Sequence, residues 1–328
     1  MKVKISELEE IGKKALTQQG YRSEEAGQIL EVLMYAQLRG NNQGLVKLIG
    51  KGIPKDPTCG SIKTIKETKL STMLDGNKTN GMIVLNHAVQ LAVAKGKEHG
   101  FGIAGTNNTC TSTGAIGYYA RKVAEQGLIG FVFSGSGIPT VATHGSYEPL
   151  FGTNPLAIGV PSENEPLVLD LATAAMAFYG LIEAKTDGQK IPADIAYDKN
   201  GKLTTDPSEA MDGALRTFDK SYKSAHLSLM VEILSGPLVG AAFAGIGQGN
   251  WGNLVFAFDP ELLTDTGEFK KKVAALCTKV KGVKKLPGVN EVYLPSERGN
   301  RLTQERLNSG EIEIEDNLYN ELKKAAGL

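Results

Sequence analysis

The turn that follows the second predicted helix gathers polar side chains that suit the binding of a small anion. In the stretch RGNNQGLVKL (39–48), Asn42 and Gln43 sit in a glycine-bounded turn, and Lys47 follows one turn later. A side-chain amide donates and accepts hydrogen bonds but does not exchange a proton at neutral pH, so Gln43 can orient a ligand without acting as an acid. Lys47 has two interpretations: it pairs with a carboxylate as a point charge, or it is an ordinary solvated lysine.

Histidine is the side chain best suited to move a proton near neutral pH. His144 lies in THGSYEPLFGTNPLAIGVP (143–161), a glycine- and proline-rich connection between two predicted strands. Binding and catalytic residues concentrate in such connections, which makes His144 the first candidate for an acid. His226 lies on a long predicted helix, either lining a site or as an ordinary helix residue. His87 and His99 are twelve residues apart on another helix, so they cannot share a metal ion by i,i+4 spacing, and we predict no metal site.

Two charged side chains stand at the ends of predicted elements. Asp170 comes near the end of the apolar strand PLVLDLA (166–172), with Thr173 directly after it. Its carboxylate is either a satisfied structural acceptor or a group that binds hydroxyls. Lys223 lies near the start of a predicted helix over 221–234, where a cation and helix N–H groups together can hold an anion. The alternative for Lys223 is a solvated surface lysine.

The common nucleotide-binding and hydrolase motifs do not explain this chain. GFGIAG (100–105) matches G-x-G-x-x-G, but it follows a predicted helix and contains a strand, whereas a Rossmann fingerprint needs a strand before it and a helix opening on it. We interpret it as a helix stop followed by a strand that tolerates glycine. The sequence contains no phosphate-loop pattern and no G-x-S-x-G nucleophile elbow.

The elements that must position these residues change in type along the chain. The first 50 residues are predicted to be mainly helical, and strands alternate with helices from about residue 70. Helices are predicted over 81–100, 118–127, 176–185, 221–234, 268–282 and 317–327, and strands over 101–106, 128–134, 156–161, 166–172, 253–258 and 290–295. The pattern predicts an α/β (α+β) protein with a mainly helical lobe over 1–70 plus 300–328 and an α/β lobe over 71–299 that binds cofactor and substrate.

Composition excludes several classes of protein. The 328 residues carry 36 Lys and Arg against 36 Asp and Glu, and this balance gives no electrostatic footprint for nucleic acid or a membrane surface. The apolar runs are too short to span a bilayer, which needs about 20 residues. The charged start MKVKISELEE is not a signal peptide, so we expect a cytoplasmic protein. Three scattered cysteines argue against a disulfide framework.

Several of these segments occur together in one known family. GTNPLAIGVP (152–161), the strand PLVLDLATA (166–174), the helix ending MVEILSGPLVGA (230–241), FAFDPELL and YLPSER follow one another in collinear order along nearly the whole chain. This arrangement resembles the type-2 malate/lactate dehydrogenases, which include ureidoglycolate and sulfolactate dehydrogenases, diketogulonate reductase and cyclic-imine reductases. The resemblance implies a non-Rossmann nicotinamide-binding fold with a mixed sheet, a homodimer, and hydride exchange between NADH or NADPH and a small 2-oxo or 2-hydroxy acid.

The resemblance also assigns roles to individual positions. It implies cofactor contacts in three segments, namely Asp170, Ala172 and Thr173; Tyr222 and Lys223; and Ser296, Glu297 and Arg298. GTNP, with Gly152, Thr153 and Asn154, would be the supporting turn beneath the site. Asn42, Ser112 and Thr113 would belong to the substrate loops, and Lys47 takes the place of a residue that binds the substrate carboxylate.

The chain departs from the family pattern at positions that carry the acid–base chemistry. Gln43 stands where the family keeps its proton-donating histidine, Ser112 stands in a second histidine position, and Ser224 replaces a glycine. The sequence thus predicts a divergent member, with three alternatives. Another acid serves, with His144 first and Lys47, Lys223 or a bound water next; or the substrate, such as a protonated imine, carries its own proton; or catalysis is lost and the protein binds a metabolite or nucleotide.

Overall fold

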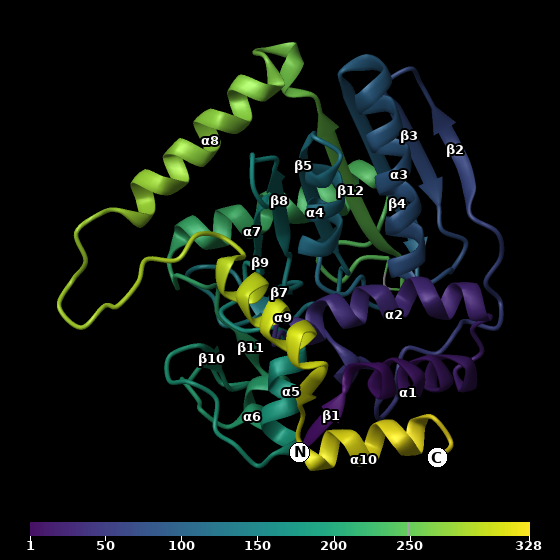
Figure 1. Cartoon of the computed structure of the whole chain (residues 1–328). Helices are drawn as coiled ribbons and strands as arrows, with labels where there is room; N and C mark the ends of the chain where they lie inside the picture. The colour runs from purple at the N-terminus through teal and green to yellow at the C-terminus, as the bar shows by residue number, and fades with distance from the viewer. Residues whose placement is uncertain (248) are drawn as a thin grey trace.

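A mixed seven-stranded sheet forms the centre of the molecule (Figure 1). The computed structural model describes residues 1–247 and 249–328. In spatial order the strands of this sheet are β2 (Lys63–Glu67), β3 (Ser71–Asp75), β4 (Phe101–Thr109), β12 (Trp251–Phe258), β5 (Ile129–Gly135), β8 (Leu156–Val160) and β9 (Leu167–Leu171). Only the β3–β4 pair is parallel among these neighbours. The sheet therefore confirms the expected mixed, non-Rossmann α/β architecture.

Alternating side chains give the sheet two apolar faces. Helices α3 (Gly81–His99) and α4 (Gly117–Glu125) pack on one face, where Val132 and Val255 belong to the large hydrophobic core. Phe133 follows Val132 on β5, and Leu254 precedes Val255 on β12. Both belong to a smaller cluster with the turn η2 (Pro237–Val239). Helix α7 (Tyr222–Ser235) contacts β5 and β12 and contributes Leu234 to that cluster. Period-two alternation thus buries both faces.

Helices from both ends of the chain form a second layer below the large sheet (Figure 1). Strand β1 (Lys2–Lys4) pairs antiparallel with β13 (Glu311–Glu313), which brings the two ends of the chain together. Helices α1 (Ile5–Gln18), α2 (Ser23–Leu38) and α10 (Asp316–Ala325) share one hydrophobic core with α3, α4 and the sheet. The expected helical segments at both ends are confirmed. Strand β2 pairs with β3 across the expected lobe boundary at residue 70, and the division into two lobes stays a prediction.

A small four-stranded sheet lies beside this layer. Its order is β10 (Ala196–Tyr197), β11 (Ala214–Leu215), β6 (Val141–Ala142) and β7 (Pro149–Phe151). Helices α5 (Phe178–Thr186) and α6 (Pro207–Asp212) pack with it around a core of their own. Two separate segments build this unit: β6 and β7 lie between β5 and β8 in the sequence, and α5, β10, α6 and β11 lie between β9 and α7.

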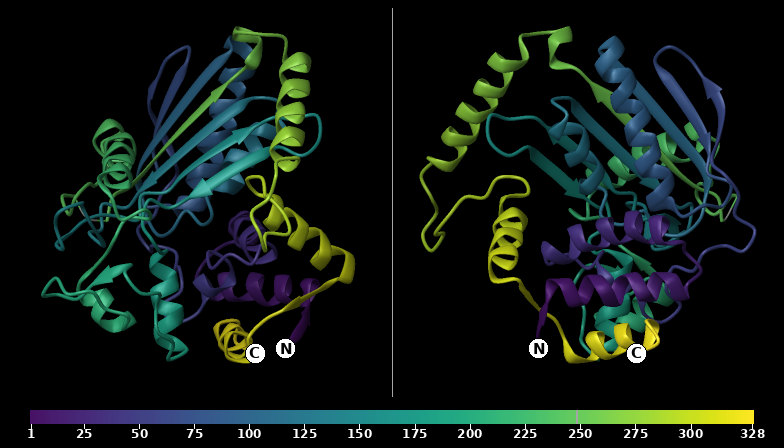
Figure 2. Two further views of the ribbon diagram at one scale, coloured as in Figure 1. Left: turned by 90° about the vertical axis from the view of Figure 1, so that its left-hand side faces the viewer. Right: turned by 45° about the vertical axis from the view of Figure 1, so that its right-hand side comes forward.

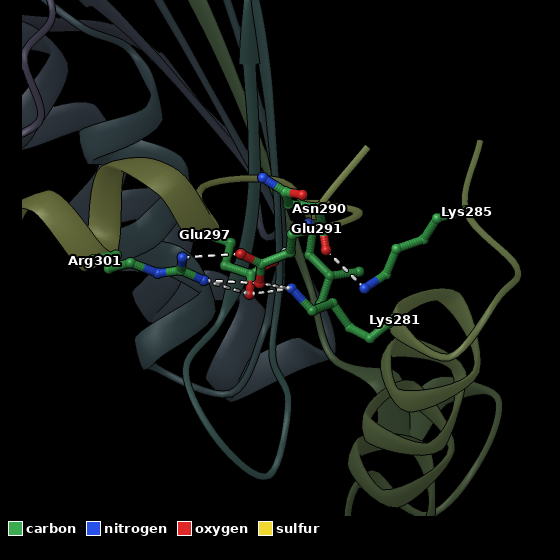
Figure 3. Close-up of polar contacts among 7 residues, drawn as sticks. Lys281, Lys285, Asn290, Glu291, Glu297 and Arg301 are labelled. Atoms are coloured by element: carbon green, nitrogen blue, oxygen red, sulfur yellow. Dashed lines mark hydrogen bonds and ion pairs between the residues drawn. The ribbon is translucent and has the colours of Figure 1, made fainter. Parts of the chain in front are cut away.

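Helix α8 (Thr266–Lys281) stands away from the body as an arm (Figure 2) and is followed by a long connection to α9 (Glu297–Ser309). Ion pairs close the base of this connection (Figure 3). Arg301 donates two hydrogen bonds, of 2.9 and 2.8 Å, to the Glu291 carboxylate, and Lys281 pairs with Glu291 and Glu297. These cations lower the pKa of Glu291 to about 2, so the cluster stays ionised at neutral pH.

The predicted strand over 290–295 is wrong. These residues form an irregular connection between α8 and α9, and the Leu294 N–H is bound by the Glu297 carboxylate at 2.8 Å instead of by a neighbouring strand. The apolar pattern of VYLP was the misleading signal, because Val292, Tyr293 and Leu294 are not paired at any sheet edge. Helix α9 begins directly afterwards. The sequence placed residues 300–328 in a mainly helical lobe, but it did not give the bounds of this helix.

Close packing of α3 on β4 gives a test of this fold. A side chain at Gly102 would overlap the backbone carbonyl of Ala92, whereas Gly27 on α2 has open space around it. We expect Gly102→Ala to lower the free energy of unfolding by at least about 2 kcal/mol, because backbone atoms cannot move aside cheaply. Gly27→Ala is the matched control and should be neutral or stabilising by up to about 1 kcal/mol from helix propensity. Chemical denaturation measures both, and equal stability of the two variants would contradict the packing.

Candidate active site

A large cleft separates the terminal helices from the edge of the seven-stranded sheet. Its volume is about 1630 Å³, and it is lined by the end of α2 and the following turn, by β9, by α5, and by the segments around α9 and α10. Pockets for single drug-sized ligands usually measure roughly 300–1,000 Å³, so this cleft has room for a larger ligand or for two.

Lys47 is the most unusual side chain of the cleft. It lies on the single turn η1 (Leu45–Leu48), and Leu45 and Leu48 on either side of it are anchored in the large core. Its side chain is only 1% exposed, and its Nζ has no hydrogen-bond partner among residues 1–247 and 249–328. Burial lowers the pKa of Lys47 well below its usual value. The amine is therefore held in the cleft wall without a counter-ion.

An aromatic ring faces this amine. Nζ of Lys47 lies 3.5 Å from the centroid of the Tyr179 ring on α5, a distance suited to a cation–π contact. Burial also raises the pKa of Tyr179, which keeps its phenol protonated at neutral pH. The ring therefore supports the ammonium form of Lys47 without neutralising its charge.

The turn before Lys47 is fixed by side-chain amides. Gln37 accepts a hydrogen bond from the Leu45 N–H at 3.0 Å, and the Gln43 N–H is bound by Asn41 Oδ1 at 2.9 Å. Asn42 and Lys47 line the cleft. Gln43 turns its amide toward its neighbour, with Nε2 3.4 Å from Asn42 Oδ1. Asn42 is thus the amide that faces the cleft, and Gln43 supports it.

Asp170 lies across the cleft on β9. Its Oδ2 accepts a hydrogen bond from the Gly117 N–H at 2.9 Å, at the start of α4, and a side chain at Gly117 would crowd this carboxylate at 2.8 Å. Desolvation raises the pKa of Asp170 to about 6, and the bond from Gly117 opposes that rise. The carboxylate remains open to the cleft and is ionised at neutral pH. It can therefore accept hydrogen bonds from hydroxyl groups of a ligand.

The third segment of the cleft is the turn at the start of α9. Ser296 has a left-handed backbone conformation, and its Oγ donates a hydrogen bond of 2.8 Å to the Val168 carbonyl on β9. Ser296 and Arg298 line the cleft with Asp170. Glu297 faces the other way, into the ion-pair cluster with Lys281 and Arg301 (Figure 3). The structure thus joins two of the three expected cofactor segments.

Thr173 and the GTNP turn (Gly152–Pro155) form a buried polar network below β9 and α7. Thr173 Oγ1 lies 3.1 Å from both the Thr153 and Asn154 carbonyls, and Asn154 Nδ2 donates to the Ser228 carbonyl at 3.1 Å. Gly152 cannot carry a side chain here without crowding Asn154. Ala172 packs against the core of the small sheet. These residues hold elements together and do not open onto the cleft wall.

His144, Tyr222 and Lys223 lie on another surface. His144 lines a separate cavity of about 210 Å³ with Arg216 and Lys220, and its ring centroid is 6.3 Å from that of Tyr222. Tyr222 in turn lies 5.6 Å from His226. Lys223 is exposed at the start of α7, after Ser221, whose hydroxyl caps the helix. The reason is topological: the chain around His144 leaves the large sheet to form β6 and β7.

Ser112 and Thr113 occupy the loop between β4 and α4. Ser112 Oγ accepts a hydrogen bond from the Gly114 N–H at 3.1 Å, and Thr113 Oγ1 lies 3.1 Å from Ser134 Oγ. The Tyr119 hydroxyl donates to the Thr113 carbonyl at 2.9 Å. Both hydroxyls are therefore engaged within the protein.

Sequence reasoning missed two cleft residues, Tyr179 and Arg39. Arg39 stacks on Tyr35 at 3.8 Å and donates a hydrogen bond of 2.7 Å to Asn300. Its position at the end of a helix was visible, but its partner is 261 residues away. Tyr179 gave no local signal either, because its contact with Lys47 joins elements far apart in the chain.

The described residues contain neither a metal-binding cluster nor a helix that could span a membrane. Within 1–247 and 249–328, no group of three or more His, Cys, Asp or Glu side chains is arranged to hold a metal ion. Nor does any helix in that part of the chain have the length and apolar character needed to cross a bilayer.

Comparisons with known proteins define the family. The model for the malate/L-lactate dehydrogenase family matches residues 3–323. A malate/(S)-sulfolactate dehydrogenase of Methanothermus fervidus is 34% identical over 328 residues, which cover 95% of this chain and 94% of that protein. Ureidoglycolate dehydrogenase (NAD(+)) of Escherichia coli is 29% identical over 97% of this chain and 94% of its own length. The crystal structure of malate dehydrogenase from Entamoeba histolytica matches with a TM-score of 0.91 at 27% identity, covering 100% of this chain and 97% of that one.

The fold and the matched relatives define an oxidoreductase of the non-Rossmann, nicotinamide-dependent type. The chain belongs to the malate/L-lactate dehydrogenase family. The resemblance drawn from GTNP, the Asp170 strand and YLPSER is thereby confirmed, as is the expectation of a dehydrogenase of the malate/lactate type.

The burial of Lys47 predicts an effect on stability. We expect Lys47→Met to raise the melting temperature at pH 7, because methionine fills similar space without the desolvation of an amine. The folded pKa of Lys47 lies below the unfolded value of about 10.4. Between these two pH values the unfolded wild type binds one more proton than the folded wild type, so the folded state gains stability as pH rises. The advantage of the variant should therefore shrink toward pH 10. Calorimetry across pH 6–10 measures it, and an unchanged or lower melting temperature at pH 7 would contradict the burial of an unpaired amine.

Proposed function

We propose that this protein transfers a hydride between NADH or NADPH and a small 2-oxo or 2-hydroxy acid, or a related imine. The observation that carries the proposal is the buried, unpartnered Lys47 amine in the same cleft as Asp170. An uncompensated cation site beside a large cavity suits an anionic substrate, because the ligand then supplies the missing counter-charge.

The residues present fit a nicotinamide cofactor. The cleft combines a carboxylate that can accept bonds from ribose hydroxyls, Asp170, with cations suited to a pyrophosphate, Arg39 and Arg298. Arg39 also has a buried Nε without a partner within the described chain. We propose that Asp170, Ser296 and Arg298 hold the cofactor. When bound, a reduced nicotinamide supplies a hydride to the oxo carbon of the substrate.

The substrate end of the site is assigned to the turn after α2. Lys47 attracts the carboxylate of the acid, and Asn42 offers an amide to its oxygen atoms. Gln43 holds Asn42 in place through its own amide. Closure of this end by the buried Leu45–Leu48 turn keeps water away from the reacting carbon, which strengthens these interactions.

A specific observation favours one alternative. Neither Gln43 nor Ser112 can take part in acid–base chemistry near neutral pH, and both use their polar atoms within the protein. A homologue without turnover that binds a metabolite or nucleotide is therefore the second candidate function.

One experiment separates the two functions. We expect reduced nicotinamide to quench protein fluorescence and raise the melting temperature, and a panel of 2-oxo acids to include one that is turned over. Asp170→Asn should weaken cofactor binding about tenfold or more, through loss of a charge-assisted acceptor, and wild-type affinity should fall below about pH 6 as Asp170 takes up a proton. Cofactor binding without turnover, together with a gain of activity in Gln43→His, would favour the impaired homologue. No binding of either cofactor at millimolar concentration would exclude both nicotinamide-based functions.

We also propose that the protein is a cytoplasmic homodimer. Helix α7 exposes one apolar stripe, in which Tyr222, Met230 and Ile233 are 52%, 50% and 42% accessible. Apolar patches of this kind mark interfaces between proteins. A second copy of the chain is the occupant that the family resemblance predicts. Sedimentation velocity should give twice the 34.9 kDa chain mass, and a monomer at all concentrations would contradict this assignment.

A further inference from the structure

We propose that Lys47 is the residue that gives the substrate oxygen its proton during reduction and takes it back during oxidation. This inference rests on the proposed function and deepens it. It assigns to an amine the task that the family pattern gives to a histidine at the position of Gln43.

Geometry leaves Lys47 as the acid of the cleft. Its Nζ is buried and unpartnered, and η1 fixes its backbone through Leu45 and Leu48, so the amine is preorganised. Gln43 cannot ionise. His144 lies in a different cavity, with Arg216 and Lys220. Lys223 is exposed on α7. Of the three side chains considered as the acid from the sequence, His144, Lys47 and Lys223, only Lys47 lines the cleft that contains Asp170.

A single ammonium can perform both tasks required of this position. It has three N–H donors, and a 2-oxo acid presents a carboxylate oxygen and an oxo oxygen on adjacent carbons. One N–H holds the carboxylate while another donates to the oxo oxygen. As the hydride and its electron pair arrive at the oxo carbon, the C–O π pair moves onto oxygen. An N–H bond of Lys47 then breaks and an O–H bond forms, leaving a 2-hydroxy acid and a neutral amine, which regains a proton from water.

The surroundings of Lys47 suit a reversible proton carrier. Burial lowers the pKa of Lys47 well below its usual value, so the buried amine releases a proton more readily than a solvated lysine does. The ring of Tyr179 favours the ammonium form. The other charged groups that line the same cleft come from every element around it: Arg39, Lys51, Asp170, Glu183, Asp187, Arg298, Arg306, Glu313, Glu315 and Glu321. The anionic members favour the proton on Lys47 and the cationic members oppose it.

The decisive variant is Lys47→Arg, which keeps the charge but cannot release a proton. We expect it to bind oxamate, an unreactive analogue of a 2-oxo acid, in the presence of NADH within about tenfold of wild type. We expect reduction to fall on the order of 10²–10⁴-fold. In wild type, kcat/KM for reduction should decline as pH rises through the pKa of Lys47, and this limb should be absent from the residual activity of the variant. Lys63→Arg, at an exposed lysine on β2 that does not line the cleft, is the matched control and should behave as wild type.

A second measurement does not depend on turnover. Calorimetry of oxamate binding in buffers of different ionisation enthalpy reports the protons taken up. At a pH above the folded pKa of Lys47, wild type should take up a fraction of a proton as Lys47 becomes charged against the ligand, and Lys47→Arg should take up none. Equal proton uptake by the two proteins would contradict the proposal.

Three further results of these experiments would separate the role of Lys47 from the proposed function. Full activity in Lys47→Arg would overturn the proposal and leave Lys47 as a carboxylate anchor, with the proposed function intact. If Lys47→Arg fails to bind oxamate, Lys47→Ala with added ethylamine decides: restored turnover supports the proposal and no restoration overturns it. If wild type binds neither cofactor nor oxamate, the proposed function itself fails.

Discussion

One continuous hydrophobic core joins the helices at both chain ends to a face of the large sheet, and the cleft depends on that junction. The core includes Leu16 and Leu33 from the terminal helices, Val132 and Val255 from the sheet, and Leu322 near the end of the chain. The pairing of β1 with β13 holds the last helix against the first. If this layer separated from the sheet, η1 would lose the packing of Leu45 and Leu48, and Lys47 would return to water.

The polar groups of the site are arranged on this apolar support at some cost in stability. A buried amine without a partner opposes folding, and local desolvation raises the pKa of the Asp170 carboxylate to about 6 although it opens onto the cleft. Such groups persist in enzymes because ligand binding repays their desolvation. The contrast with Asn154 and Thr173 is informative. The Asn154 amide nitrogen and the Thr173 hydroxyl form hydrogen bonds within the protein, which indicates a structural role for these two groups.

The proposed role of Lys47 offers an answer to the departure that the family resemblance predicts at Gln43. That resemblance implies a histidine and a basic residue that divide the tasks of proton transfer and carboxylate binding. Here the basic residue is a lysine, which titrates, rather than an arginine, which does not. Gln43 supports Asn42 through its amide, and the Lys47 amine in the same cleft as Asn42 combines charge with an exchangeable proton. The same fold can thus keep its reaction while changing the group that carries the proton.

The sequence by itself determined the class of fold, most of the elements and the family. Local signals were sufficient for these, because helix periodicity in α2 and α3, alternation in β5 and β12, and the collinear GTNP and YLPSER segments are all read from neighbouring residues. The run over 290–295 failed for the opposite reason: a strand needs a partner, and no partner adjoins it. Only the tertiary structure decided which polar residues share the cleft. Lys47 contacts Tyr179, which is 132 positions away in the sequence, and Ser296 contacts Val168, which is 128 positions away. His144 lies on another surface. Burial and proximity arise from the packing of distant elements, and a linear pattern carries no direct record of either.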